Sequence, residues 1–147
     1  MATTRREFLQ AGMVAGLAAA ATLPAFKALA QTTPVVPTYQ HAADPAHLTA
    51  LEAKHWPKLA IKGKLTTGKP YQLMIQIGHQ IHPMTTAHHI EWVEVWSGGT
   101  KVARVDFAEP TLAQPVLTVN LVRNAPSELK VRMNCNLHGL WENSILA

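Results

Sequence analysis

Short runs of alternating apolar and polar residues dominate the chain after Pro57, and turn-forming residues separate them. A period of two is typical of strands that bury one face. The runs occupy residues 59–63, 71–77, 89–96, 101–107, 115–122 and 128–134. Gly98 and Gly99 lie between the third and fourth runs and predict a hairpin. Six or seven short strands predict an all-β fold, an immunoglobulin-like antiparallel β-sandwich.

A short helix is predicted before the strands. Asp44 can cap it, Pro45 suits its first turn, and Pro57 prevents its continuation. Residues 31–45 are proline-rich and lack periodicity, so we interpret them as an extended linker or surface arm. Because 147 residues have room for one ordinary domain, residues 46–147 are expected to form it.

The first thirty residues are predicted to be a cleavable export signal. Arg5 and Arg6 precede an alanine-rich apolar run at 11–25, and residues 28–30 are small enough for a signal peptidase. The run is too short and too weakly hydrophobic to favour a retained membrane anchor. The paired arginines resemble a twin-arginine signal, and the alternative is an ordinary secretory leader. We therefore expect a periplasmic or otherwise exported protein.

The charge of the chain excludes one class of partner, and its cysteine content raises a question. The net charge is +4; cleavage after residue 30 removes three of the 13 Lys and Arg and one of the nine Asp and Glu, leaving +2. Such a weak charge argues against nucleic-acid binding. Cys135 is the only cysteine, so it cannot form an internal disulfide. In an oxidising compartment this thiol is vulnerable unless something occupies its sulfur.

Several of the eight histidines lie at the ends of predicted elements, where separate strands can converge on a sandwich rim. They are His55, His82, His88 and, three residues after Cys135, His138. Imidazole and thiolate together suit iron, copper or zinc. The spacing alone does not establish that these five side chains belong together.

Three segments in this order resemble the signature segments of the superoxide reductases, the neelaredoxin and desulfoferrodoxin family. They are KHWP at 54–57, HPMTTAHHIEWVEVW at 82–96 and CNLHGLWE at 135–142. The resemblance implies an immunoglobulin-like sandwich with one non-haem iron that alternates between Fe2+ and Fe3+. It implies four equatorial histidines and one axial cysteine as metal ligands: His55, His82, His88, His138 and Cys135. His79 and His89 do not fall on family ligand positions.

The resemblance also implies an activity, the reduction of superoxide to hydrogen peroxide with an electron from an unidentified donor. Lys54 matches the family lysine above the open iron face, where it would attract the anion and assist protonation. The absence of an N-terminal four-cysteine module indicates the single-iron type, whose members are often tetramers, so a tetramer or dimer is possible. No membrane anchor is expected after cleavage.

One position departs from the family pattern. Many members carry a glutamate two residues before the first ligand histidine, and this chain has Ala53 there. Glu52 is one residue further away, which turns its side chain by about 100° on a helix. The departure leaves open an iron-binding electron carrier or redox sensor with little turnover. A third hypothesis is a structural sandwich with incidental histidines. Asn134 and Asn136 are candidates for hydrogen bonds to the thiolate.

Overall fold

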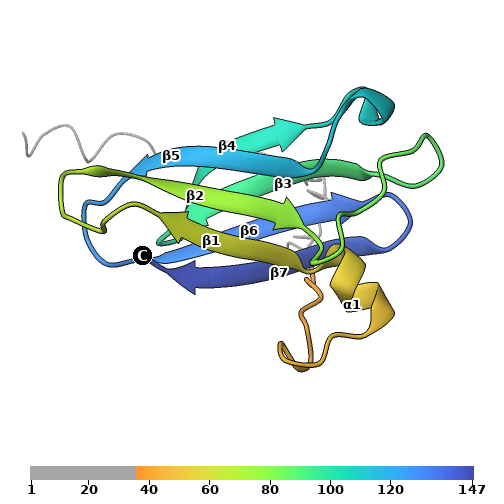
Figure 1. The fold of residues 1–147 in the computed structure, drawn as a ribbon, viewed down its shortest axis with the longest axis horizontal. Helices are drawn as coiled ribbons and strands as arrows, with labels where there is room; N and C mark the ends of the chain where they lie inside the picture. The colour runs from red at the N-terminus through yellow and green to blue at the C-terminus, as the bar shows by residue number, and fades with distance from the viewer. Residues whose placement is uncertain (1–35) are drawn as a thin grey trace, which may run out of the picture. The chain divides into compact units, whose positions relative to one another are not determined.

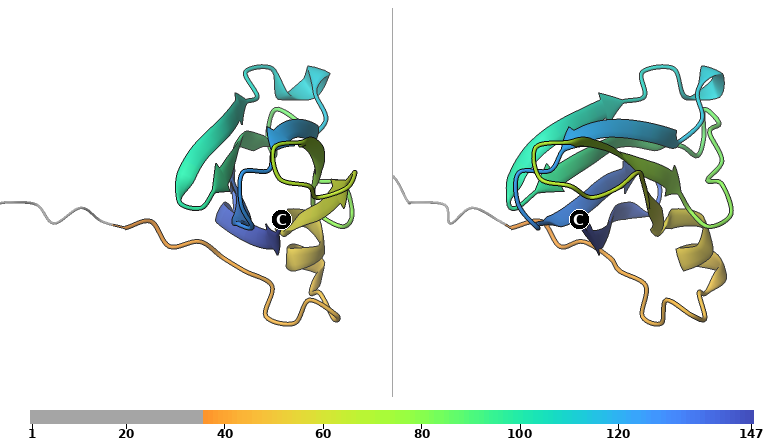
Figure 2. Two further views of the ribbon diagram at one scale, coloured as in Figure 1. Left: turned by 90° about the vertical axis from the view of Figure 1, so that its left-hand side faces the viewer. Right: turned by 60° about the vertical axis from the view of Figure 1, so that its left-hand side comes forward.

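Two antiparallel sheets form the domain in the computed structural model, which describes residues 36–147. The strands are β1 (Pro57–Lys62), β2 (Pro70–Ile77), β3 (Ile90–Ser97), β4 (Thr100–Asp106), β5 (Val116–Val122), β6 (Glu128–Cys135) and β7 (Gly139–Leu146). One sheet has the order β1-β2-β5 and the other β4-β3-β6-β7. The two sheets face each other as layers of a sandwich (Figure 1, Figure 2). The predicted fold class is confirmed.

The core lies between the two sheets and follows the period-two pattern of the sequence. Every second residue of β2 and β6 points inward and is buried. In β2 and β6 these are Tyr71, Leu73, Ile75, Ile77, Leu129, Val131, Met133 and Cys135. Cys135 is therefore the last member of an inward-facing series, which places its sulfur inside the sandwich at the end of β6.

Two local predictions were wrong or incomplete. The helix α1 spans Ala50–His55 and begins after Thr49, not near Asp44. Thr49 and Glu52 form a capping box, in which each side chain accepts from the other residue's backbone N–H, and this satisfies two donors at the start of the helix. Asp44 instead accepts from the backbone N–H of Ala46 in a separate turn. The seventh strand, β7, was absent from the predicted runs.

Residues 36–49 run outside the sandwich and lead into α1, as the orange segment of Figure 2 shows. The segment is largely extended, yet Gln40 pairs with Trp141 of β7 through a parallel β-bridge. The predicted export signal at residues 1–30 lies outside the described residues. Between residues 36 and 147, no helix combines the length and apolar character needed to cross a membrane.

Three segments meet at one end of the sandwich (Figure 1). They are α1, the connection from β2 to β3 at residues 78–89, and the β6–β7 hairpin loop at residues 136–138. Gly78 allows α1 and the β2–β3 connection to approach each other closely. A Cβ at this position would lie 2.4 Å from the carbonyl oxygens of Lys54 and Gln80. Its φ of +77° also disfavours any residue with a side chain.

Gly78→Ala is expected to lower the free energy of unfolding by about 3 kcal/mol, because both the backbone angle and the clash oppose a methyl group. Gly98→Ala is the matched control: Gly98 also has positive φ, +52°, but a Cβ there meets open space. The control is expected to cost about 1 kcal/mol. Urea unfolding of both variants in the same metal-loaded state measures the difference, and equal losses would contradict the close approach at Gly78.

Candidate metal centre

His55 is the last residue of α1, and its side chain is completely buried. The Nδ1 atom lies 2.7 Å from the backbone carbonyl oxygen of Leu51, one helical turn earlier. A carbonyl oxygen can only accept, so Nδ1 carries the proton. The neutral ring therefore has its lone pair on Nε2, which points into the end of the sandwich.

His82 and His88 come from the connection between β2 and β3. His82 is 1 % exposed, and its Nδ1 lies 2.6 Å from the carbonyl oxygen of Pro83, so its lone pair is also on Nε2. A tight turn holds His88: Thr85 donates its backbone N–H to the His88 carbonyl at 2.9 Å, and the His88 N–H donates to Thr85 Oγ1 at 3.0 Å. The loop backbone is thus bonded on both sides of the side chain.

The β6–β7 hairpin supplies Cys135 and His138. Cys135 pairs with Gly139 across the base of the hairpin, and the three residues between them form its loop. Cys135 Sγ is buried and lies 3.5 Å from His138 Nδ1. The Cys-x-x-His spacing therefore brings the two side chains together because it spans one tight hairpin.

The four imidazole rings form a closed square. Adjacent ring centroids are 4.7 Å apart for His55 and His82, 4.5 Å for His82 and His88, 4.9 Å for His88 and His138, and 4.5 Å for His138 and His55. Each adjacent pair is edge-on, with interplanar angles of 64–79°. His82 and His138 thus occupy opposite corners.

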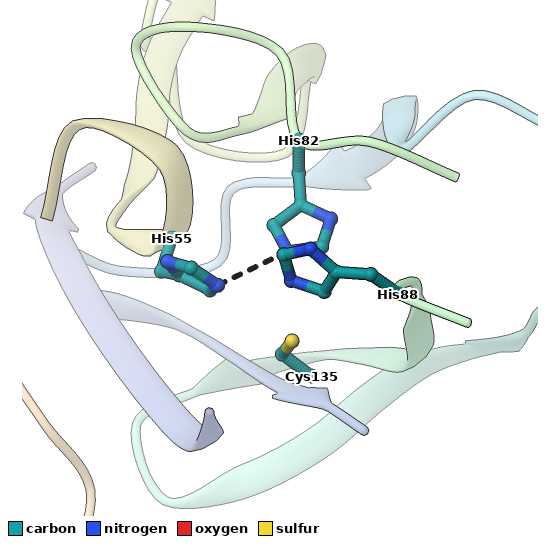
Figure 3. Close-up of side chains that lie close together, drawn as sticks. All are labelled: His55, His82, His88 and Cys135. Atoms are coloured by element: carbon teal, nitrogen blue, oxygen red, sulfur yellow. Dashed lines mark hydrogen bonds between the residues drawn. The ribbon is translucent and has the colours of Figure 1, made fainter. Parts of the chain in front are cut away.

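The donor atoms of this site suit a metal ion. One candidate donor atom from each of His55, His82, His88 and Cys135 lies within 4.8 Å of all the others. Within residues 36–147 this group includes no carboxylate. His138 is not one of its four members, although its ring closes the square and its Nδ1 lies 3.5 Å from Cys135 Sγ. Figure 3 shows the three rings above the sulfur of Cys135.

The described chain offers no hydrogen-bond donor to the nitrogen lone pairs of these rings, so a cation would be their partner. Nε2 of His55 and Nε2 of His82 are 3.1 Å apart (dashed line, Figure 3), but both Nδ1 atoms hold the ring protons, so no proton lies between them. His88 Nε2 is buried and has no hydrogen-bond partner among the described residues. Three unpaired lone pairs and one sulfur facing the same space fit a transition metal that accepts nitrogen and thiolate ligands.

The ionisation of the histidines agrees with this role. Burial lowers the pKa of His82 to about 3, and the neighbouring histidines add to the effect, while its hydrogen bond to Pro83 opposes it. Burial also lowers the pKa of His55 and of His88, with a further contribution from the charge of Lys54. Neutral imidazole is the form that binds metals, so these rings need not lose a proton to do so.

The two asparagines beside Cys135 make most of their hydrogen bonds to other residues. Asn136 accepts from the backbone N–H of His89 through Oδ1 at 2.9 Å and donates from Nδ2 to the Ala87 carbonyl at 3.0 Å. Asn134 Nδ2 donates to Glu91. Among the described residues, Asn136 is the asparagine that contacts the sulfur: its Oδ1 lies 4.0 Å from Cys135 Sγ and accepts from the thiol, and neither amide nitrogen donates to the sulfur. Asn136 instead fastens the residues on both sides of His88 to the hairpin.

Glu52 cannot take the place of the absent family glutamate without leaving its helix cap. Its Oε1 accepts from the Ala43 N–H at 2.8 Å and its Oε2 from the Thr49 N–H at 2.7 Å, so both oxygens are engaged. These backbone donors lower the pKa of the carboxyl group and keep it ionised.

The remaining residues singled out by sequence lie around the site. Lys54 is exposed at the end of α1, next to His55. The ring of His79 stacks on Trp56 with centroids 5.7 Å apart, and His89 Nδ1 lies 3.0 Å from the Thr85 carbonyl. The indole of Trp141 stacks on His55, with the ring centroids 5.3 Å apart.

An all-β sandwich with a buried histidine and cysteine cluster at one end defines a class of non-haem metal proteins. The desulfoferrodoxin family model matches residues 47–144, which include every residue of the cluster. The chain belongs to the desulfoferrodoxin family.

Relatives of known name agree with this assignment. The chain is 31 % identical over 101 residues to the superoxide reductase of Pyrococcus horikoshii, covering 63 % of this chain and 85 % of the relative. The solved superoxide reductase (neelaredoxin) of Ignicoccus hospitalis is 32 % identical with a TM-score of 0.57, covering 63 % of this chain and 78 % of that one. That of Nanoarchaeum equitans is 26 % identical with a TM-score of 0.59, covering 75 % and 100 %.

His88→Ala is expected to reduce the iron content from about one per chain to well below one, because it removes one lone pair from the cluster. The adjacent His89→Ala is the control, since the His89 ring binds the Thr85 carbonyl and should leave the iron content unchanged. Metal analysis of the purified variants measures the result. Equal iron in both would remove His88 from the site.

Proposed function

We propose that the protein is a superoxide reductase that uses one iron ion held by His55, His82, His88, His138 and Cys135. The observation that carries the proposal is the convergence of unpaired Nε2 lone pairs and a buried sulfur at the end of a desulfoferrodoxin-type sandwich. When bound, iron supplies one electron and a coordination position for a small anion. Reduction of superoxide to hydrogen peroxide takes one electron and two protons.

The protein's own groups prepare the site for that reaction. Burial lowers the pKa of His55, His82 and His88, which keeps these three rings in the neutral form that binds a metal. The Nδ1–H groups of His55 and His82 donate to backbone carbonyls, which fixes the direction of both rings. Because the helix, the connecting loop and the hairpin each fix one part of the square, little reorganisation is needed when a substrate arrives.

Lys54 attracts the superoxide anion and donates a proton to the reduced product. Its side chain is exposed beside the buried His55, and its charge already lowers the pKa of His55 and His88. A positive charge at the mouth of the site raises the local concentration of superoxide and its association rate. The Nζ ammonium group can also pass a proton to the reduced product, directly or through water.

The engagement of Glu52 in the helix cap supports a site that has no carboxylate over its open face. Such a site gives a small anion entry without first displacing a protein ligand. The hypothesis of a carrier with little turnover rested on the departure at Ala53, and a site that needs no displacement weakens that argument.

We further propose that the protein is exported through a twin-arginine-type signal at residues 1–30. A machinery that exports folded proteins would allow iron to be inserted before translocation. The electron would come from an outside donor, and assembly into dimers or tetramers is compatible with the exposed strands β4 and β5.

The function is tested by mixing the reduced, iron-loaded protein with superoxide generated by pulse radiolysis. Second-order oxidation of the iron centre with one hydrogen peroxide formed per superoxide is the expected result. Iron that oxidises slowly would instead identify an electron carrier or sensor, and a protein purified without metal under iron-replete conditions would overturn the proposal.

Lys54→Ala is expected to slow the reaction with superoxide by about ten-fold or more, with the iron content unchanged, because the steering charge is lost. Lys54→Arg should restore most of the rate and its dependence on ionic strength. Lys58→Ala, which removes an exposed lysine from β1, is the control and should have little effect. A Lys54→Ala rate equal to that of the control would exclude the proposed role.

A further inference from the structure

Residues 39–43, here called the strap, connect the two chain segments that carry His55 and His138. At one end the Gln40 N–H donates to the Leu140 carbonyl at 2.9 Å, and the Glu142 N–H donates to the Gln40 carbonyl at 3.0 Å. At the other end the Ala43 N–H donates to Glu52 in α1. The strap therefore spans from the hairpin strand β7 to the helix that ends at His55.

The side chain of Gln40 reaches the metal-binding hairpin itself. Its Nε2 donates to the backbone carbonyl oxygen of His138 at 2.7 Å. The same oxygen accepts from the indole Nε1 of Trp141 at 3.3 Å, and that indole stacks on His55. Two donors on one carbonyl fix the orientation of the peptide between His138 and Gly139, where the chain turns with a φ of +71°.

Tyr39 holds the strap from the outer face of the sheet. The guanidinium of Arg132 lies 4.6 Å from the centre of the Tyr39 ring, and Arg132 Nε donates to Glu142 Oε2 at 2.6 Å. Arg132 also lies over Trp96, at 4.9 Å. Tyr39 is thus placed by an ion pair on β6 and β7, which positions the neighbouring Gln40 over the hairpin.

We propose that the strap is part of the metal site and that Gln40 is a positioning residue for His138. The inference rests on the proposed iron site but not on the identity of the substrate. Within residues 36–147, backbone carbonyls contact the rings of His55 and His82, whereas no backbone carbonyl contacts the ring of His138, whose Nδ1 lies 3.5 Å from Cys135 Sγ. The Gln40 amide orients His138 through the backbone instead.

The contacts of the strap distinguish it from a linker. Residues 31–45 have the composition of a linker, yet within them Gln40 binds the hairpin and Ala43 binds the helix cap. A true linker would tolerate any polar residue at position 40. A strap requires a donor of this length there.

The test compares variants of the mature, iron-loaded chain in two measurements that involve no superoxide. Gln40→Glu keeps the size of the side chain but removes the donor. Iron release to an excess of chelator should become about ten-fold faster, as expected when a group that orients a metal ligand is lost. The thiolate-to-iron charge-transfer band of the oxidised protein should shift, because that band depends on the geometry around the sulfur and not on overall stability.

The control is Gln72→Glu, which removes a similar hydrogen bond on the other sheet, from Gln72 Nε2 to Asn120 Oδ1 at 3.1 Å. It should leave the release rate and the band unchanged. Gln40→Met, of similar length and uncharged, repeats the test if the glutamate variant does not fold. Variants at Gln40 that match the control in both measurements would overturn the inference, whatever the protein's rate with superoxide.

Discussion

The structure depends on one electrostatic constraint: buried, neutral imidazoles present lone pairs to a common space in which the described chain offers them no proton. His55 and His82 donate hydrogen bonds from Nδ1–H to backbone carbonyls, and His88 Nε2 has no hydrogen-bond partner in the described region. Left alone, such an arrangement costs free energy, since buried polar atoms lose their hydrogen bonds to water. A bound cation converts this cost into binding energy, so the metal and the fold stabilise each other.

The sandwich keeps the buried histidines away from the apolar core. Apolar residues of β2 and β6 fill the space between the sheets, and the histidines are confined to one end, where α1, the 78–89 connection and the β6–β7 hairpin meet. Each of the three segments is held in place by its own contact. Asn136 bonds the loop around His88 to the hairpin, Glu52 caps the helix, and Gly78 allows the helix end and loop to touch. These contacts transmit the rigid packing of the two sheets to the positions of the histidine side chains.

The same contacts determine the position of Glu52. Glu52 is committed to the backbone of Ala43 and Thr49, so it stabilises the N-terminal end of the helix instead of approaching the metal. Its partner Ala43 belongs to the strap, which continues to the His138 carbonyl through Gln40. The carboxylate thus serves the site indirectly, by connecting the helix that bears His55 to the hairpin that bears His138. Lys54 is exposed at the end of the same helix, next to His55.

The sequence by itself determined the strands with strict alternation and, through the motif resemblance, the five candidate ligands, because period-two burial and short motifs are local properties. The inward position of Cys135 followed from the structure. The sequence pattern missed β7, whose pattern merges with the metal-binding hairpin, and it placed the helix start at Asp44 because several caps were available nearby. Only the tertiary structure decided which cap forms, that Glu52 is engaged, and that Gln40 reaches His138, 98 residues away. Contacts between distant segments depend on how two sheets pack, and no local pattern encodes that packing.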